Sequence, residues 1–173
     1  MGQRASSLPH DEIAGIAEET GFSRNQILSL HERYLQLGGG RESLVRHDLQ
    51  ISEMEQNPFQ HRVIEAFFLG ENEINFRRFI GVLAALRPDA PRVKKLKLGF
   101  TLIDTDVDGY LTRNDLEAVV DCIVSDVAGE QRDSLVDRLM AEADADKDGK
   151  ITFEKYCKAL EQFDIVWRLS MRF

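Results

Sequence analysis

Carboxylates alternate along one short stretch of the chain in a spacing that suits a divalent cation. The stretch is residues 104–115, DTDVDGYLTRND. Its aspartates occupy positions one, three, five and twelve, as Asp104, Asp106, Asp108 and Asp115. Hard cations such as Ca²⁺ and Mg²⁺ bind several oxygens, and a tightly curled loop turns alternate side chains toward its centre. The spacing therefore predicts a cation-binding loop.

Residues within and beside this stretch strengthen the prediction. Gly109 at position six allows the sharp turn that a side chain would obstruct. Tyr110 at position seven would contribute only its backbone carbonyl. Apolar patterns typical of helices flank the loop, LKLGFTLI before it and LEAVVDCIV after it. This combination predicts an EF-hand, and the alternative of an accidental acidic run on a surface loop is disfavoured by the helical flanks.

A second copy of the pattern, DADKDGKITFEK, spans residues 144–155. Its candidate ligands are three carboxylates and one backbone carbonyl, those of Asp144, Asp146, Asp148 and Lys150. Because EF-hands normally occur in pairs, the repeat supports both assignments. The apolar residues at position eight, Leu111 and Ile151, are expected to pair across the two loops.

Position twelve distinguishes the two loops. An EF-hand usually has Glu there, which supplies two oxygens. The first loop has Asp115, one methylene shorter, which should lower the affinity for Ca²⁺ and favour Mg²⁺. The second has Lys155, with Glu154 one residue early and about 100° away around the exiting helix. We therefore expect one working ion site, at 104–115, whereas the second loop is a weak or structural site.

The composition excludes several classes of function. Over 173 residues the chain has a net charge of −8, which disfavours nucleic acid as a partner. No apolar run reaches the roughly 18–20 residues that a membrane span needs, and no secretory hydrophobic region is present, so we expect a cytoplasmic protein. The sequence also has no glycine-rich phosphate loop, nucleophile elbow or histidine-based metal site. We therefore expect a binding protein rather than an enzyme.

The rest of the chain is organised around the two ion loops. Two further helix–loop–helix patterns precede them, but Gly38, Gly40 and Glu42 stand near where three carboxylates would be required. The predicted fold is all-α, with four EF-hands in two lobes and short β pairs at position eight of paired loops. The predicted segments are an N-terminal segment (1–22), an N-lobe of two ion-free hands (23–86), a proline-containing linker (87–91), a C-lobe with both ion loops (92–163) and an apolar tail (164–173).

Two local patterns make sharper predictions about helices. Ser23 and Gln26 have the spacing of a capping box at the start of a helix. The basic run RVKKLK follows the linker. On a helix we expect Val93, Leu96 and Phe100 to face inward while the lysines point to water.

Both ends of the chain carry signals for interaction. The first six residues, MGQRAS, match the myristoylation motif, in which Gly2 is acylated, and an ordinary frayed terminus is the alternative. One acyl chain gives only marginal membrane binding, so a stable location at a membrane would need a partner there. The tail is unusually apolar, and an exposed apolar strand favours aggregation. We expect the tail to pack on its own domain or to occupy a groove.

Several short motifs together resemble the calcineurin B-like branch of EF-hand proteins. The likeness is greatest to the calcineurin B homologous proteins, which are subunits of Na⁺/H⁺ exchangers, and it extends along nearly the whole chain. Besides the two loops, the residues that carry it are Met1–Ser6, Glu19–Ser23, Asn57-Pro58, Ala66–Phe68, Asn75–Arg77, Phe79, Arg87-Pro88 and Leu169–Phe173.

The resemblance implies a cytosolic, myristoylated protein, monomeric apart from its partner and peripheral to membranes. It implies Ca²⁺ in the ion loops and a hydrophobic cleft that spans both lobes and receives an amphipathic helix of a membrane transporter of the Na⁺/H⁺ exchanger type. This chain departs from the family in two ways. Its linker is shorter than usual, and Lys155 stands where the fourth loop normally has Glu.

The leading hypothesis is therefore a calcium-binding regulatory subunit whose ion sets the angle between hand helices and holds a groove open. Seven apolar residues are candidates for lining the groove, although most could equally form the lobe cores: Phe67, Phe68, Phe79, Leu83, Phe100, Leu139 and Leu160. A partner of another kind, a calcineurin-like phosphatase or an integrin tail, remains open. So does a Ca²⁺ or Mg²⁺ buffer without a partner, although both position-twelve residues argue against the tight sites that a buffer needs.

Overall fold

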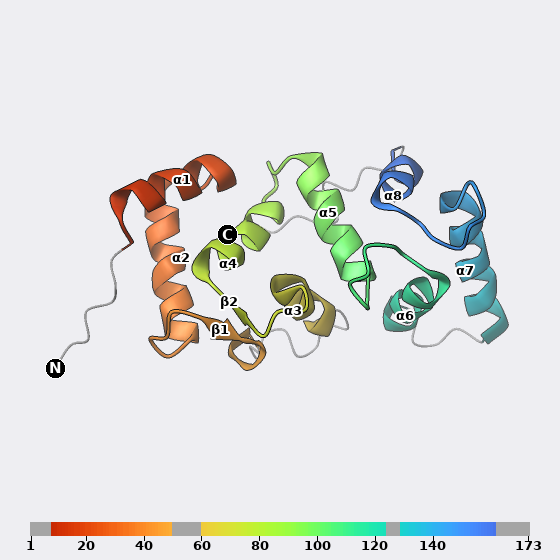
Figure 1. The fold of residues 1–173 in the computed structure, drawn as a ribbon, viewed down its shortest axis with the longest axis horizontal. Coiled ribbons are helices and arrows are strands. Elements are labelled where there is room, and N and C mark those ends of the chain that lie inside the picture. Colours follow the sequence, from red (N-terminus) through yellow and green to blue (C-terminus); the bar gives the residue numbers. More distant parts are fainter. Residues whose placement is uncertain (1–7, 50–59, 124–128, 162–173) are drawn as a thin grey trace.

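The fold is almost entirely helical. The computed structural model describes residues 8–49, 60–123 and 129–161. The elements in these ranges are α1 (His10–Thr20), α2 (Arg24–Leu37), β1 (Leu44–Val45), η1 (Arg46–Leu49), α3 (Gln60–Phe68), β2 (Glu73–Ile74), α4 (Phe76–Ala85), α5 (Arg92–Ile103), α6 (Arg113–Ile123), α7 (Gly129–Ala143) and α8 (Phe153–Ala159). Figure 1 shows α1 and α2 toward one end of the molecule and α7 at the other. The all-α EF-hand fold predicted from the sequence is confirmed.

Local signals in the sequence account for the end of α1 and the start of α2. The hydroxyl of Ser23 accepts a hydrogen bond from the backbone N–H of Gln26, and the Gln26 side chain accepts one from the backbone N–H of Ser23 at 2.9 Å. The predicted capping box is therefore confirmed. Just before it, Gly21 ends α1 with φ 73°, a left-handed conformation that glycine adopts without steric cost.

In the N-lobe, a small sheet and a buried tyrosine hold the two hands together. β1 pairs antiparallel with β2, with Leu44 opposite Ile74. Tyr34 on α2 is 1% exposed, and its hydroxyl lies 2.8 Å from the carbonyl oxygens of both Glu42 and Ile74. Ile16 of α1 packs in the same core, so α1 is part of this lobe.

The C-lobe is built in a similar way around a second core. Leu111 and Ile151 exchange two backbone hydrogen bonds, of 2.9 and 2.8 Å, in an antiparallel bridge between the ion loops. The predicted pairing at position eight is thus confirmed. In the same core, Phe100 meets Phe153 and Tyr156 edge-on, with ring centroids 5.6 and 5.5 Å away. These rings link α5 to α8, the first and last helices of the lobe.

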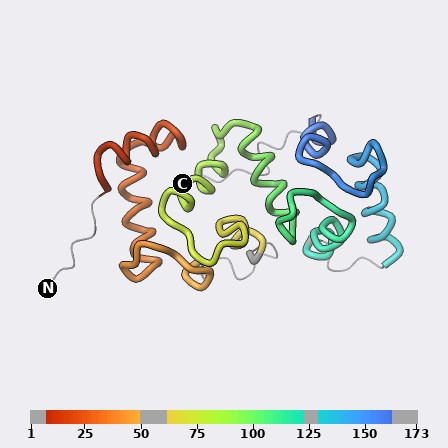
Figure 2. The backbone as a smooth tube through the Cα atoms, in the orientation of Figure 1, coloured from red at the N-terminus to blue at the C-terminus, as the bar shows by residue number. Residues whose placement is uncertain are grey.

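The helix α5 joins the two lobes. Figure 2 shows its tube running between the N-lobe helices and α6 to α8. A small cluster of buried side chains spans the boundary, with Ala66 on α3, Ala85 on α4 and Leu98 on α5. Nearby, Arg62 donates a hydrogen bond to the carbonyl of Leu102 at 3.2 Å. The lobes are therefore held by direct contacts as well as by the linker.

The orientation predicted for α5 is wrong at two positions. Leu96 and Phe100 are buried as expected, but Val93 is 63% exposed and Lys95 is fully buried. The ammonium of Lys95 donates a hydrogen bond to the carbonyl of Arg87, at the start of the linker. Because that contact satisfies the charged group, the helix can turn a lysine inward, which the apolar periodicity alone does not reveal.

Two predictions from the sequence, acylation at Gly2 and the placement of the tail at 164–173, concern residues beyond those described. Asn57-Pro58, which carries part of the family resemblance, also lies outside the described ranges. Within the described part of the chain, none of the helices is long and apolar enough to cross a membrane.

Candidate metal centre

The first ion loop brings its carboxylates together between α5 and α6. Oxygens of Asp104, Asp106 and Asp108 all lie within 4.8 Å of one another. Gly109, at φ 86°, makes the predicted turn, and its N–H donates to Asp104 at 3.1 Å. The N–H of Tyr110 donates to Asp108 at 2.8 Å. An all-oxygen set of this kind suits Ca²⁺ or Mg²⁺, so the residues present fit the predicted cation.

Asp115, predicted as the position-twelve ligand, is 1% exposed and accepts hydrogen bonds from two threonines. Thr105 donates to one carboxylate oxygen through its backbone N–H at 2.9 Å and also through its hydroxyl. Thr112 donates to the other oxygen at 2.8 and 2.6 Å. Burial acts to raise the pKa of Asp115, but these hydrogen bonds outweigh it and leave the pKa below its ordinary value. Both threonines were missed from the sequence, although hydroxyl side chains commonly bond loop groups nearby.

Negative charge accumulates in the first loop. Burial is the main cause that raises the pKa of Asp104, and the carboxylates of Asp108 and Asp115 act in the same direction. Hydrogen bonds from the backbone N–H groups of Gly109 and Asp108 only partly offset them. A divalent cation would relieve the repulsion among these groups. The electrostatics of the loop therefore favour cation binding.

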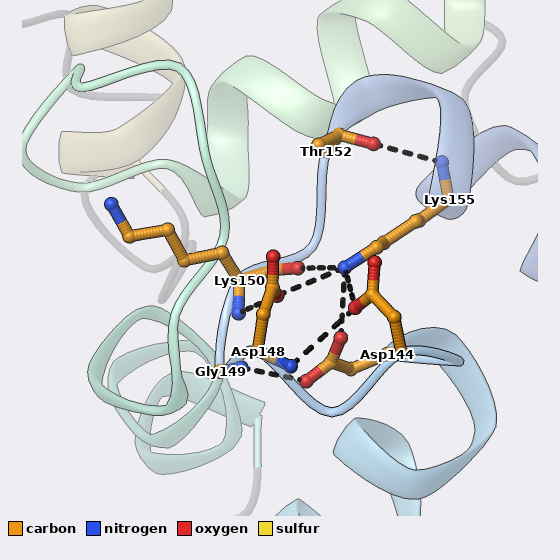
Figure 3. A network of polar contacts seen from close by, with 7 residues as sticks. Asp144, Asp148, Gly149, Lys150, Thr152 and Lys155 are labelled. Carbon is orange, nitrogen blue, oxygen red and sulfur yellow. Dashed lines mark hydrogen bonds and ion pairs between the residues drawn. The ribbon is translucent and has the colours of Figure 1, made fainter.

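The second loop gathers the same set of oxygens around an ammonium group. The carboxylates of Asp144, Asp146 and Asp148 again lie within 4.8 Å of one another. The Nζ of Lys155 lies 2.9 Å from an oxygen of Asp144 and 2.9 Å from one of Asp148, and it also pairs with Asp146. The carbonyl of Lys150 accepts a further hydrogen bond at 2.7 Å. Figure 3 shows these contacts converging on Nζ.

The charges in this network stabilise one another. The hydrogen bond from Lys155 is the main cause that lowers the pKa of Asp144 to about 2. Burial acts to lower the pKa of Lys155, but the three carboxylates outweigh burial and raise it. Because the pKa of Asp148 is lowered by the same lysine, Asp144, Asp148 and Lys155 are all charged at neutral pH. Glu154, considered from the sequence as another ligand, is exposed on α8.

In the N-lobe, arginine side chains form contacts within the interhelical loops. Arg41 donates a hydrogen bond to the carbonyl of Gly38 at 2.8 Å and forms a two-point ion pair with Asp48 at 2.6 and 2.8 Å. Arg46 pairs with Glu65 at 2.7 and 3.0 Å and donates to the carbonyl of Glu71 at 2.8 Å. Side-chain ion pairs thus stabilise loops whose sequences lack the ladder of carboxylates. No pattern in the sequence pointed to a role for either arginine.

Most residues proposed to line a partner groove lie inside the lobe cores. Four of them are buried: Phe67, Phe68, Phe79 and Phe100. Leu83 and Leu160 are partly buried, whereas Leu139 is 37% exposed beside Leu135, which is 40% exposed one turn earlier on α7. The structure therefore favours a core role for the four phenylalanines, and α7 presents an exposed apolar pair.

A surface hollow of about 350 Å³ lies where the two lobes meet. Its lining includes apolar residues such as Ala66, Val82, Ala85 and Leu98. Charged groups also line it, including Glu19, Arg77 and Lys94. The hollow could receive individual side chains of a partner, since it combines apolar surface with both signs of charge.

Comparisons with known proteins agree with the geometry of the loops. An EF-hand domain pair matches residues 93–161, which contain both ion loops. The calcineurin B subunit of Naegleria gruberi is 32% identical to this chain over 99% of each sequence. The chain belongs to the calcineurin B-like EF-hand family. The resemblance inferred from the sequence is confirmed at this level, whereas membership of the calcineurin B homologous branch stays a prediction.

Two further relatives also match along most of this chain. The type 1 calcineurin B subunit of Dictyostelium discoideum is 31% identical over 90% of this chain and 89% of the relative. Calcium and integrin-binding family member 2 of Rattus norvegicus is 29% identical over 90% of each chain. Similarity thus extends over both lobes and reaches family members with different named partners.

Proposed function

We propose that this protein is a calcium-binding regulatory subunit that binds an amphipathic helix of a partner protein. The observation that carries the proposal is the carboxylate cluster of the first loop, in a chain similar to a calcineurin B subunit over 99% of its length. The residues that would hold Ca²⁺, or Mg²⁺ as the alternative, are Asp104, Asp106, Asp108, Asp115 and the carbonyl of Tyr110. The protein acts by binding, without catalysis of its own.

The position of the loop explains how an ion would influence a partner site. A bound ion supplies positive charge that holds the loop carboxylates together. Because α5 enters this loop and α6 leaves it, the loop sets the angle between the two helices. Leu98 on α5 also packs against Ala66 and Ala85 of the N-lobe. Changes at the loop can therefore reach the surface between the lobes.

Two surface features support helix binding. Leu135 and Leu139 lie four residues apart on α7 and share one exposed face, the spacing at which a helix presents neighbouring apolar side chains. The hollow between the lobes adds apolar surface formed by residues such as Val82 and Leu98. Exposed apolar surface on a folded domain often marks an interaction site. We assign these features to the partner in place of the buried phenylalanines.

For the partner we propose a membrane transporter of the Na⁺/H⁺ exchanger type. The motifs MGQRAS and LSMRF support this choice, since both resemble the calcineurin B homologous proteins. Acylation of Gly2 would add a weak membrane contact to the one provided by the transporter, which gives a peripheral location in the cytoplasm. The catalytic chain of a phosphatase is the second candidate, favoured by the 32% identity to a calcineurin B relative.

Fluorescence anisotropy with two labelled peptides tests the proposal on the full chain. One peptide is the cytoplasmic amphipathic helix of a Na⁺/H⁺ exchanger, and the other is the helix through which a calcineurin-type phosphatase holds its regulatory partner. We expect tight binding to the exchanger peptide in calcium. Leu139→Glu should weaken binding by about tenfold or more, since it places a charge in an apolar contact.

Leu28→Glu is the control, because Leu28 on α2 is 41% exposed and lies outside α7. It should leave the affinity nearly unchanged. Tighter binding to the phosphatase peptide than to the exchanger peptide would make the phosphatase, and not the exchanger, the proposed partner. Failure to bind either helix at any calcium concentration would refute the proposed function.

A further inference from the structure

Lys155 occupies the place at which an EF-hand loop holds its ion. Its ammonium contacts four oxygens, from Asp144, Asp146, Asp148 and the carbonyl of Lys150. These are loop positions one, three, five and seven, the same protein groups that coordinate a cation in this motif. The carboxylates of the loop are therefore satisfied by a cation that belongs to the chain.

The start of α8 fixes this arrangement. Thr152 caps the helix, and its hydroxyl accepts a hydrogen bond from the backbone N–H of Lys155 at 3.2 Å. Side chains in a helix lean toward its N-terminus, which here leads back into the loop (Figure 3). The side chain of Lys155 is 16% exposed and that of Asp144 is 6% exposed. The ion pair at the centre of the loop is thus largely shielded from water.

A divalent ion would have to displace this ammonium in order to bind the loop. Carboxylates already paired with a cation at 2.9 Å attract a second cation less strongly. After displacement, the ammonium would remain close to the incoming ion, because the side chain tethers it, and like charges repel. The tether also maintains a high effective concentration of the ammonium, so it competes with free ions at every calcium level.

We propose that Lys155 is a built-in cation that keeps the second loop folded around its carboxylates without a metal ion. The loop then supports its neighbour, because Lys150 directly precedes Ile151, which exchanges two hydrogen bonds with Leu111 of the first loop. The Nζ of Lys150 also lies 4.7 Å from the ring centroid of Tyr110. The protein therefore binds one divalent ion, in the first loop. The role of Lys155 does not depend on which partner helix the protein binds.

Calcium titrations of the full chain test this inference through two glycine amide signals in NMR spectra. The N–H groups of Gly109 and Gly149 donate to the first aspartate of their own loops, at 3.1 and 2.9 Å. An amide proton bonded to a carboxylate resonates downfield, so each signal reports on one loop. In the wild type we expect the Gly109 signal to respond to calcium. The Gly149 signal should lie downfield already in EDTA and should not respond.

Three variants identify the part played by Lys155. Lys155→Met removes the charge, so the Gly149 signal should move upfield in EDTA. Lys155→Glu supplies the missing position-twelve carboxylate, so calorimetry should show two Ca²⁺ ions per chain in place of one. Lys147→Glu is the matched control, because it makes the same change of charge at an exposed residue of the same loop. It should leave one ion per chain.

Two results would overturn the inference. One is a second Ca²⁺ ion bound by the wild-type loop, and the other is a second ion gained by Lys147→Glu as readily as by Lys155→Glu. A chain that binds no calcium while the Gly149 signal stays downfield would refute the proposed calcium-binding function and support the role of Lys155.

Discussion

At the scale of single residues, position twelve distinguishes two loops that otherwise share the same acidic ligands. In the first loop Asp115 is a buried carboxylate bonded to Thr105 and Thr112. In the second, Lys155 pairs with the carboxylates of its own loop, including Asp144 at 2.9 Å. A metal ion would therefore meet a carboxylate at position twelve in the first loop and a tethered ammonium in the second. Removing the carboxylate at the same position of each loop should therefore affect calcium binding unequally.

Asp104→Ala and Asp144→Ala test this inequality, since each removes the position-one carboxylate of its loop. We expect Asp104→Ala to abolish the principal calcium-binding event, because the oxygen cluster loses a ligand. Asp144→Ala should change the calcium isotherm little. Isothermal titration calorimetry measures both, and the two variants control for each other because they change the net charge equally. Loss of the principal heat in Asp144→Ala, with its retention in Asp104→Ala, would contradict the assignment.

At the scale of elements, each lobe joins its two loops by a short antiparallel contact. In the C-lobe the contact is the bridge between Leu111 and Ile151. In the N-lobe the strands β1 and β2 are reinforced by Tyr34, which lies within 2.8 Å of carbonyls in both loops. Burial raises the pKa of Tyr34 to about 12, so the hydroxyl keeps its proton and can donate a hydrogen bond. We infer that Tyr34 stabilises the N-lobe without any ion.

Tyr34→Phe should therefore destabilise the N-lobe. It removes a buried hydrogen bond and leaves a carbonyl without that donor, which costs about 1–2 kcal/mol. Urea unfolding followed by circular dichroism measures the change in the free energy of unfolding. Tyr110→Phe removes the hydroxyl of a tyrosine that is 39% exposed, and it should change stability by less than about 0.5 kcal/mol. Equal changes in the free energy of unfolding would show that the buried hydroxyl of Tyr34 stabilises the protein no more than the exposed hydroxyl of Tyr110 does.

At the scale of the whole molecule, α5 makes the two lobes one unit. One face of the helix places Leu98 against Ala66 and Ala85 in the N-lobe. Another places Phe100 among the aromatic rings of the C-lobe core. Arg92, at the start of α5, also donates a hydrogen bond to the carbonyl of Leu160 after α8. Because one helix packs against both lobes, the lobes should unfold together.

Leu98→Ala should weaken this coupling. Deleting a buried leucine side chain typically costs about 2–5 kcal/mol, and here the lost contacts are those between the lobes. We expect differential scanning calorimetry to resolve two transitions where the wild type shows one. Val93→Ala on the same helix is the control, because Val93 is 63% exposed. A single transition in Leu98→Ala, lowered only as in Val93→Ala, would mean that the lobes are not coupled through this residue.

Local patterns in the sequence were sufficient to predict several elements. The capping box of Ser23 and Gln26 depends on residues three apart, and the pairing of Leu111 with Ile151 follows from a repeated loop pattern. The orientation of α5 could not be predicted in this way. Lys95 is buried because the chain brings the carbonyl of Arg87 to its ammonium, and periodicity carries no information about that contact.

The sequence by itself determined the kind of fold and the position of both ion loops, because ligand spacing within a loop is a local property. It also showed that Lys155 stands where a carboxylate is required. Only the tertiary structure decided what that lysine does, since the path of α8 directs its side chain into the loop. It likewise assigned Phe67 and Phe79 to a core, because burial depends on contacts between distant helices.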